Sequence, residues 1–327
     1  MSVPASVQQF LARRAGPGAV RVDQLPLPLA RDYFERFMPI TDIVPRALAN
    51  IEDVTFDARD GARLAARIYY RCTPDWTNPQ PALLYFHAGG YVVGTLGTAD
   101  AICRMLAADA GCAVVSVAYR LAPEYRFPYA ANDALDALRW LHREAGAYGL
   151  DAARLAVGGE SSGATLAAVV AVQARDLAIP LALQLLIYPA LSASTDSDTH
   201  RLYGEGYFLT RDVIRWIQRT YLRNVDDAND WRFAPLDGRR HAPGRLGGIA
   251  PAWIVSAEFD PLRDEHARYA ARLRDAGNRV DARFYAGMIH GFFSMGRAIP
   301  EARNAHRDAA AALRDALQTA ADDASDV

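Results

Sequence analysis

A buried strand that runs into a Gly-x-Ser-x-Gly turn and then into a helix constrains this chain more than any other segment. The turn spans residues 159–163, Gly-Glu-Ser-Ser-Gly, with an apolar run before it and a helical pattern after it. A side chain on so tight a turn has strained backbone geometry, and glycine at both ends lets neighbouring backbone pass close by. The pattern predicts an α/β fold in which Ser161 is presented at a helix N-terminus, the setting of a nucleophilic serine.

The total of lysine and arginine residues is 36, and all of them are arginine, so the chain contains no lysine. A Schiff base, a pyridoxal anchor and a serine–lysine dyad are therefore excluded. The glycine spacing around Ser161 also resembles a phosphate-binding loop, but that loop requires lysine where Ala164 stands. The nucleophile interpretation is favoured, although a Gly-x-Ser-x-Gly sequence occurs by chance in roughly one chain of ten at this length.

The composition of the chain limits the classes of protein to which it can belong. With 327 residues and 51% hydrophobic residues, the chain is long enough to bury one large core. A net charge of −2 gives no basic surface for nucleic acid. The cysteines Cys72, Cys103 and Cys112 are too few and too irregularly spaced for a disulfide framework or a zinc site, and we expect no metal or cofactor. With no signal peptide and no apolar run of about 20 residues, we expect a cytoplasmic protein without a membrane span.

Short apolar runs alternate with helical patterns from about residue 50 to the end. We expect strands at 53–58, 64–70, 82–87, 113–118, 154–158, 183–188, 252–257 and 280–285. We expect helices at 98–110, 129–148, 162–176, 262–276 and 300–320. This alternation predicts a mostly parallel, eight-stranded sheet flanked by helices, whose first two strands form an antiparallel hairpin at the edge.

Two segments do not fit the alternation. Residues 1–48 carry an apolar and aromatic pattern, and residues 191–245 are rich in tyrosine, phenylalanine and tryptophan without a strand pattern. An insertion at the carboxyl ends of the strands lies where ligands bind in open α/β sheets. We therefore expect the two segments to form a helical cap over a core made of residues 49–190 and 246–327.

A serine nucleophile needs a base and a group that orients the base. His290 follows the last predicted strand, at the same sheet edge as the serine turn, whereas the other six histidines have places on helices, in the cap or at a strand end. Asp260 follows the strand at 252–257 and precedes a helix, so it is either the orienting acid or a helix cap. Glu258 is the alternative acid.

Backbone donors for an oxyanion require small residues near the nucleophile. The loop at residues 87–91, His-Ala-Gly-Gly-Tyr, ends the third predicted strand and resembles the glycine-rich loop of esterases. A flexible turn is the alternative interpretation of this loop.

Taken together, these segments resemble the hormone-sensitive-lipase-like branch of the α/β-hydrolases, bacterial carboxylesterases with an HGGG-type loop. Five blocks carry the resemblance in the family's order: His87-Ala88-Gly89-Gly90, Tyr119-Arg120-Leu121-Ala122-Pro123-Glu124, Gly159-Glu160-Ser161-Ser162-Gly163, Asp260-Pro261-Leu262-Arg263-Asp264-Glu265 and His290-Gly291-Phe292. The chain departs from the family pattern at Ala88, Glu160, Ser162, Ala164 and His266, where none of the catalytic groups is affected.

The resemblance implies an α/β-hydrolase fold with a cap and a Ser161–His290–Asp260 triad. It also implies an oxyanion hole made by the backbone N–H groups of Gly89, Gly90 and Ser162. The expected reaction is ester hydrolysis through an acyl-enzyme. The resemblance further suggests a homodimer, formed through the edge strand near 280–285 and the last helix.

The aromatic residues of the cap and of the nearby loops suggest a modest apolar pocket, and short to medium acyl chains are favoured. The candidate substrate-binding residues are Tyr91, Phe37, Phe208 and Phe292. The same triad could instead cleave an amide, a formamide or a lactone. A non-catalytic small-molecule receptor on the same fold is a further alternative, but it predicts a damaged triad and all three residues are present here.

Overall fold

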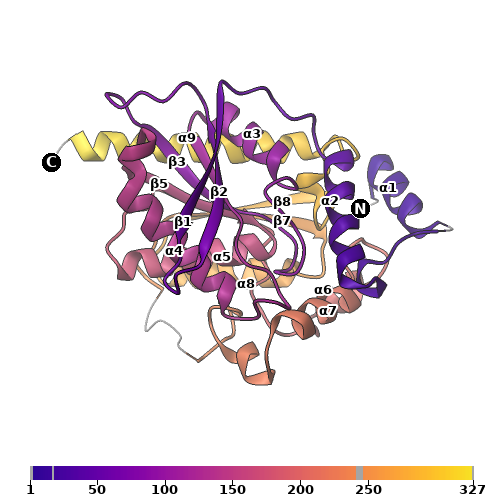
Figure 1. Cartoon of the computed structure of the whole chain (residues 1–327). Coiled ribbons are helices and arrows are strands. Elements are labelled where there is room, and N and C mark those ends of the chain that lie inside the picture. Colours follow the sequence, from indigo (N-terminus) through magenta and orange to yellow (C-terminus); the bar gives the residue numbers. More distant parts are fainter. Residues whose placement is uncertain (1–2, 17, 241–245, 326–327) are drawn as a thin grey trace.

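An eight-stranded sheet forms the centre of the molecule in the computed structural model, which describes residues 3–16, 18–240 and 246–325 (Figure 1). The strands are β1 (Asn50–Asp57), β2 (Arg63–Tyr70), β3 (Gln80–Phe86), β4 (Ala113–Val117), β5 (Leu150–Glu160), β6 (Gln184–Ile187), β7 (Ala252–Phe259) and β8 (Val280–Ile289). Their spatial order is β1-β2-β4-β3-β5-β6-β7-β8. The β1–β2 and β2–β4 pairs are antiparallel and the other pairs are parallel, which confirms the predicted fold class and the edge hairpin.

Helices cover both faces of the sheet (Figure 1). One face is covered by α3 (Asp100–Ala110) and α9 (Ala302–Ser325), and the other by α4 (Tyr129–Glu144), α5 (Ser162–Asp176) and α8 (Arg263–Asp275). All five occur where helices are predicted, although α9 extends five residues beyond the predicted end at residue 320. The predicted helix at 129–148 divides into α4 and a 3₁₀ turn at Ala145–Tyr148, and β5 is longer at both ends than the predicted strand at 154–158.

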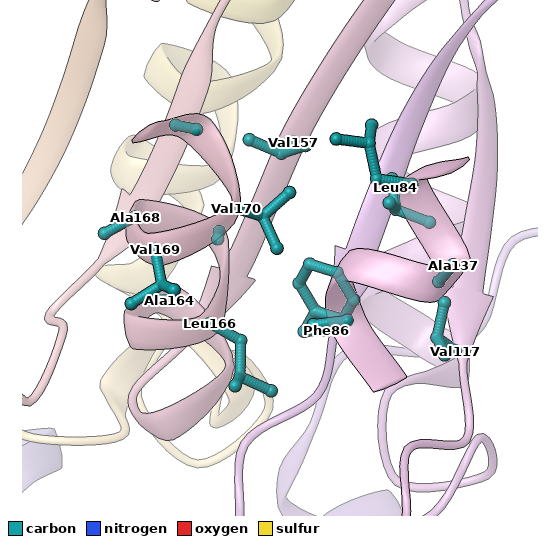
Figure 2. Packing of buried hydrophobic residues seen from close by; sticks show 14 of the residues in the cluster. Leu84, Phe86, Val117, Ala137, Val157, Ala164, Leu166, Ala168, Val169 and Val170 are labelled. Atoms are coloured by element: carbon teal, nitrogen blue, oxygen red, sulfur yellow. The ribbon is translucent and has the colours of Figure 1, made fainter. Parts of the chain in front are cut away.

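The core consists of two layers because successive side chains of a strand point to opposite faces. Leu84 and Phe86 of β3 pack with Val157 of β5 against α5 (Figure 2). Their neighbours Leu83 and Tyr85 pack on the α3 and α9 side. The continuous apolar runs of the central strands follow from this double burial.

The helices from the two segments outside the alternating pattern lie next to each other at one end of the molecule (Figure 1). These are α1 (Ala5–Ala15) and α2 (Leu27–Thr41) near the N-terminus, and α6 (Asp198–Tyr203) and α7 (Arg211–Tyr221) from the later segment. The Phe208 ring lies 5.6 Å from that of Phe10 and 6.1 Å from that of Phe37, between ring centroids. The described residues do not include positions 1–2, 17, 241–245 and 326–327 of the predicted segments.

Short 3₁₀ helices complete the described elements, at Val22–Gln24, Val225–Asn229 and Phe292–Ser294. The last of these directly follows the loop that holds His290, and its three residues are buried.

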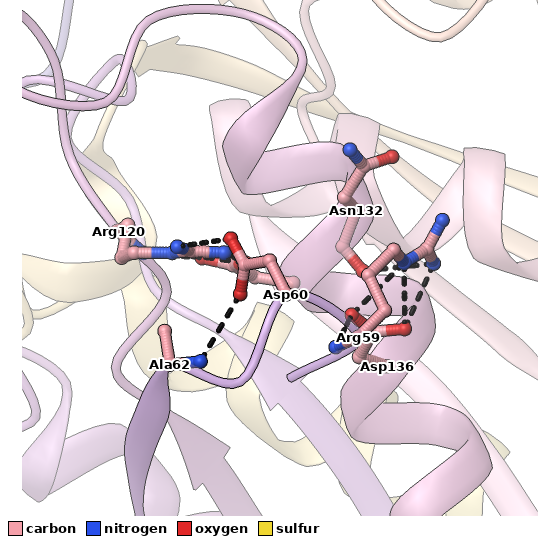
Figure 3. A network of polar contacts seen from close by, with 7 residues as sticks. Arg59, Asp60, Ala62, Arg120, Asn132 and Asp136 are labelled. Carbon is pink, nitrogen blue, oxygen red and sulfur yellow. Dashed lines mark hydrogen bonds and ion pairs between the residues drawn. The ribbon is translucent and has the colours of Figure 1, made fainter. Parts of the chain in front are cut away.

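Two arginine–aspartate networks hold the loops that flank the edge strands and α4. Arg120 lies between Asp60, at 2.7 Å, and the fully buried Asp133, at 2.5 Å, and Arg59 pairs with Asp136 on the same helix (Figure 3). The Asp133 carboxylate also accepts the backbone N–H of Arg120 at 2.9 Å. Asp133 therefore compensates a largely buried guanidinium and fixes the loop after β4 at the same time.

The two ends of the Arg120 network differ in burial, which gives a stability test. We expect Asp133→Ala to lower the free energy of unfolding by about 3 kcal/mol, because it removes the buried carboxylate that pairs with the Arg120 guanidinium and leaves the Arg120 backbone N–H without its acceptor. Asp60, whose side chain is 39% exposed, is the matched control, and Asp60→Ala should cost less than about 1 kcal/mol. Urea unfolding measures both, and equal losses would contradict the assignment of the buried pair.

Candidate active site

The turn between β5 and α5 presents Ser161 with a backbone conformation that L-residues rarely adopt. Ser161 has φ 55° and ψ −118°, and its N–H donates to the carbonyl of Ile187 at 2.9 Å. The glycines of the motif are required by close packing: a Cβ on Gly163 would lie 2.0 Å from the carbonyl oxygen of Phe86, and one on Gly159 would lie 2.5 Å from Gly163. The turn thus packs its backbone directly against the end of β3.

The imidazole of His290 connects the serine and aspartate predicted from the sequence. Its Nε2 lies 3.0 Å from the Ser161 Oγ, and its Nδ1 lies 2.8 Å from the Asp260 Oδ2. His290 directly follows β8 and Asp260 directly follows β7, so neighbouring parallel strands deliver both side chains to the edge where β5 ends. The three residues come together as predicted.

Asp260 is fully buried and has two hydrogen-bond donors, the His290 ring and the backbone N–H of Leu262 at 2.8 Å. Burial alone would raise the pKa of this carboxyl, but the His290 ring and these hydrogen bonds outweigh it, and the pKa lies below its usual value. The ionised carboxylate holds the proton of His290 on Nδ1, which leaves Nε2 as the acceptor for the serine hydroxyl.

Glu258, the alternative acid, is engaged elsewhere. Its Oε2 accepts the backbone N–H of Gly287 at 2.7 Å, across the β7–β8 pair. This contact steadies the strand that leads to His290, whereas the Asp260 carboxylate contacts the imidazole at 2.8 Å.

The glycine-rich loop after β3 lies against the serine turn. Gly89 and Gly90 have φ values of 131° and 62°, which favour glycine, and a Cβ on Gly89 would lie 2.0 Å from the carbonyl oxygen of Val93. His87 is held at the start of the loop by the Tyr119 ring, stacked at 4.3 Å, and Tyr119 donates its hydroxyl to the His87 carbonyl at 2.8 Å. Burial lowers the pKa of His87 to about 4, so the ring is neutral and serves the loop's conformation.

Ser162 connects the two halves of the predicted oxyanion site. As the first residue of α5, its N–H has no acceptor within the helix. Its hydroxyl accepts the N–H of Gly90 at 2.9 Å. In the free protein the Gly90 donor is therefore occupied by a neutral acceptor, which an oxyanion would have to replace. The sequence motif gives no indication of this side-chain contact.

Sequence reasoning missed a buried cluster beneath the nucleophile. Tyr188 donates to Glu160 at 2.5 Å, Ser294 also donates to this carboxylate, and the Tyr188 hydroxyl accepts the N–H of Phe293 at 3.2 Å. Burial raises the pKa of Glu160, and the two hydroxyl donors offset only part of that effect. Glu160 thus joins the serine turn to the turn that follows His290. Its position in the motif, where the family has aspartate, was the only available signal.

A cavity of about 340 Å³ opens beside Ser161 and His290. Its wall is mainly apolar and includes the predicted residues Phe37 and Phe208, together with Phe34, Met38, Val213, Trp216, Ile217 and Met295. Tyr91 does not line it: its ring is buried and stacks on Tyr221 at 4.1 Å, and the residue instead lines a smaller cavity of about 50 Å³ that also reaches Ser161. Phe292 is fully buried against Tyr188 and Tyr285, so it supports the loop after His290 and does not line this cavity.

Within the described ranges, no group of three or more His, Cys, Asp or Glu side chains is arranged to hold a metal ion. No helix in the same ranges combines the length and the hydropathy that a membrane crossing requires.

Comparison with known proteins shows which family this chain belongs to. The model of a family described as having the alpha/beta hydrolase fold matches residues 83–294. The ethyl acetate hydrolase of Pseudomonas putida is 44% identical over 255 residues, which cover 77% of this chain and 78% of that protein. The carboxylesterase NlhH of Mycobacterium tuberculosis is 35% identical over 313 residues, covering 85% of this chain and 97% of that protein. The chain belongs to the hormone-sensitive-lipase-like family of α/β-hydrolases.

A solved structure extends this family likeness over nearly the whole chain. The hyperthermophilic esterase from the archaeon Pyrobaculum calidifontis is 34% identical, with a TM-score of 0.88, and the match covers 96% of this chain and 99% of that one. The predicted resemblance is therefore confirmed, including the first and last segments that lie outside the range matched by the family model.

The backbone strain at Ser161 gives a second stability test. Ser161→Gly and Ser161→Ala both remove the hydroxyl, but only glycine adopts φ 55°, ψ −118° without strain. Such strain costs about 1–3 kcal/mol, and the freedom of glycine in the unfolded chain returns about 0.4–1 kcal/mol. We expect the glycine variant to be more stable than the alanine variant by about 1 kcal/mol in urea unfolding. An alanine variant of equal or greater stability would show that the turn is unstrained.

Proposed function

We propose that this protein hydrolyses carboxylic esters through an acyl-enzyme formed on Ser161, with His290 as the base and Asp260 as the orienting acid. The observation that carries the proposal is the His290 ring, whose two nitrogens lie 3.0 Å from the serine hydroxyl and 2.8 Å from a buried carboxylate. This arrangement meets the geometric requirement for a serine nucleophile activated by an imidazole.

In the proposed reaction, the Ser161 Oγ attacks the ester carbonyl carbon while its proton passes to the His290 Nε2. The carbonyl oxygen becomes an oxyanion that accepts the backbone N–H groups of Gly89, Gly90 and Ser162. When the tetrahedral intermediate collapses, the C–O bond to the alcohol breaks and His290 returns the proton to the leaving oxygen. Water, activated by His290, then attacks the acyl-enzyme, which releases the acid and restores the serine.

We further propose that residues 1–48 and 191–245 act as a cap that shapes the substrate pocket. The wall of the large cavity supports this, since most of its apolar residues come from these segments. The cavities that reach Ser161 have limited volumes of about 340 and 50 Å³, which favours short to medium acyl chains over long ones. Amide, formamide or lactone cleavage by the same triad is the alternative reaction. A non-catalytic receptor is disfavoured by the intact serine–histidine–aspartate contacts.

Labelling with an organophosphonate followed by peptide mapping tests the nucleophile directly. We expect the label on Ser161, and we expect Ser161→Ala to lose both labelling and several orders of magnitude of ester turnover with its fold retained. Parent-level esterase activity in Ser161→Ala would refute the assignment. Rates on matched ester and anilide substrates distinguish esterase from amidase activity.

The acid assignment has a matched pair of variants. Asp260→Asn removes the charge that holds the imidazole proton on Nδ1, so kcat should fall about 10³- to 10⁴-fold, as expected for a wrong tautomer. Glu258→Gln changes a nearby carboxylate that contacts only backbone N–H and should leave kcat within about threefold of the parent. Steady-state kinetics on one aryl ester measures both, and the opposite pattern would make Glu258 the acid.

A series of aryl esters with increasing acyl length tests the substrate preference. We expect kcat/KM to be highest at short to medium chains and to fall at longer ones, because the cavities that reach Ser161 limit the chain that fits. A maximum at long acyl chains would refute the proposed preference.

A further inference from the structure

A second, smaller cavity of about 50 Å³ also reaches Ser161. It shares Gly90, Ser161, Leu209 and Ile217 with the large cavity, but its lining does not include His290 or Gly291, which line the large one. The two cavities therefore meet at the nucleophile and differ in whether they contain the proposed proton donor.

This difference indicates which part of an ester each cavity receives. The leaving oxygen takes its proton from His290, so the alcohol must lie in the cavity that His290 lines. The carbonyl oxygen points to the N–H groups of Gly89, Gly90 and Ser162. The remaining substituent of the tetrahedral carbon is the acyl chain, and the smaller cavity is the space that remains for it.

The volume of the smaller cavity limits the acyl group. One water molecule needs about 10–15 Å³ of such volume, so about three or four non-hydrogen atoms fit in the space. Acyl groups from acetyl to about butyryl satisfy this limit.

The wall of the smaller cavity carries two buried polar side chains with unused hydrogen-bonding capacity. Glu265 is 2% exposed, and its Oε2 accepts the N–H groups of Leu191 and Ser192 at 2.7 and 2.8 Å. His200 is 1% exposed, and its Nδ1 contacts the Ser197 Oγ at 2.8 Å. In the part of the chain that the structure describes, the Glu265 Oε1 and the His200 Nε2 have no hydrogen-bond partner. Burial without a partner is unfavourable for both atoms, and a bound polar group would relieve it.

The charge state of these two side chains selects the kind of polar group. Burial raises the pKa of Glu265 to about 8 and lowers the pKa of His200 below its usual value. At neutral pH the carboxyl is mainly protonated and the imidazole is neutral. A neutral hydroxyl, which both donates and accepts, matches this pair better than a carboxylate or an ammonium group.

We propose that the smaller cavity is the acyl subsite and that it recognises short hydroxyacyl groups through the Glu265 carboxyl and the His200 imidazole. This inference rests on the proposed ester hydrolysis and specifies its substrate class. Ethyl 3-hydroxypropanoate and ethyl butanoate are a suitable pair of probes, because their acyl groups differ only in a terminal hydroxyl or methyl.

The first test compares kcat/KM for the two esters in the parent and in His200→Phe, which keeps an aromatic ring but loses both nitrogens. Each kcat/KM is divided by the rate constant for hydroxide-catalysed hydrolysis of the same ester. We expect this normalised value to be higher for the hydroxy ester in the parent enzyme. His200→Phe should lower the ratio of kcat/KM for the hydroxy ester to kcat/KM for butanoate about tenfold or more. Leu202→Ala, an exposed position on the same helix, is the matched control and should leave the ratio unchanged.

A second variant tests the location of the acyl group without removing a polar residue. Ala190 lines the smaller cavity and not the large one, and Ala190→Leu should reduce the volume of the smaller cavity. We expect kcat/KM for butanoate esters to fall at least tenfold relative to acetate esters, with little change along a series of alcohols. If Ala190→Leu instead changes how kcat/KM depends on the length of the alcohol, the assignment of the smaller cavity to the acyl group is wrong.

The outcomes separate this inference from the function on which it rests. If Ser161→Ala keeps esterase activity, the proposed function itself fails. If the parent is a Ser161-dependent esterase but shows no normalised preference for the hydroxy ester, the cavity holds only water and the hydroxyacyl inference is refuted. The same conclusion follows if His200→Phe leaves the ratio unchanged.

Discussion

The close backbone contact between the start of α5 and the end of β3 is the constraint on which the site depends. A Cβ at Gly163 would lie 2.0 Å from the Phe86 carbonyl, so any side chain there would push the helix away from the strand. Phe86 leads directly into the loop that contains Gly89 and Gly90. The contact therefore sets the distance between the nucleophile and its predicted oxyanion donors, and the 2.9 Å bond from Gly90 to Ser162 forms only at that separation.

The serine turn is also joined to the histidine loop from below. Glu160 precedes the nucleophile and accepts hydroxyl donors from Tyr188, at the end of β6, and Ser294, after the His290 loop. Since the carboxyl is buried and its pKa is raised, its polar atoms depend on these partners for compensation. Three segments that are distant in sequence are thus held at a common position, and the 3.0 Å contact between Ser161 and His290 follows from that arrangement.

The mostly parallel sheet, its antiparallel edge hairpin and the positions of Ser161, Asp260 and His290 could be predicted because each follows from local pattern and topology. Carboxyl ends of parallel strands meet at one edge of the sheet, so residues just after β5, β7 and β8 converge whatever their side chains. The burial of Phe292, the stacking of Tyr91 on Tyr221 and the partners of Glu160 could not be predicted. They depend on how side chains from separate segments fill shared space, which no periodicity records. The homodimer stays a prediction.

The two cavities draw on different parts of the chain. The large one is walled mainly by helices α2 and α7 and their neighbouring segments, which lie outside the sheet and its covering helices. The smaller one combines cap and core residues. From the cap segment 191–245 come Ser192, Ser194, His200, Leu209, Ile214, Ile217, Gln218 and Phe233, and from the core come Gly90, Tyr91, Ser161, Ser162, Ala190, Leu262 and Glu265. Residues 1–48 line the large cavity and not the smaller one, so changes in that segment would alter the proposed alcohol side alone. Changes in α7, which lines both cavities, would alter both sides of the proposed substrate site.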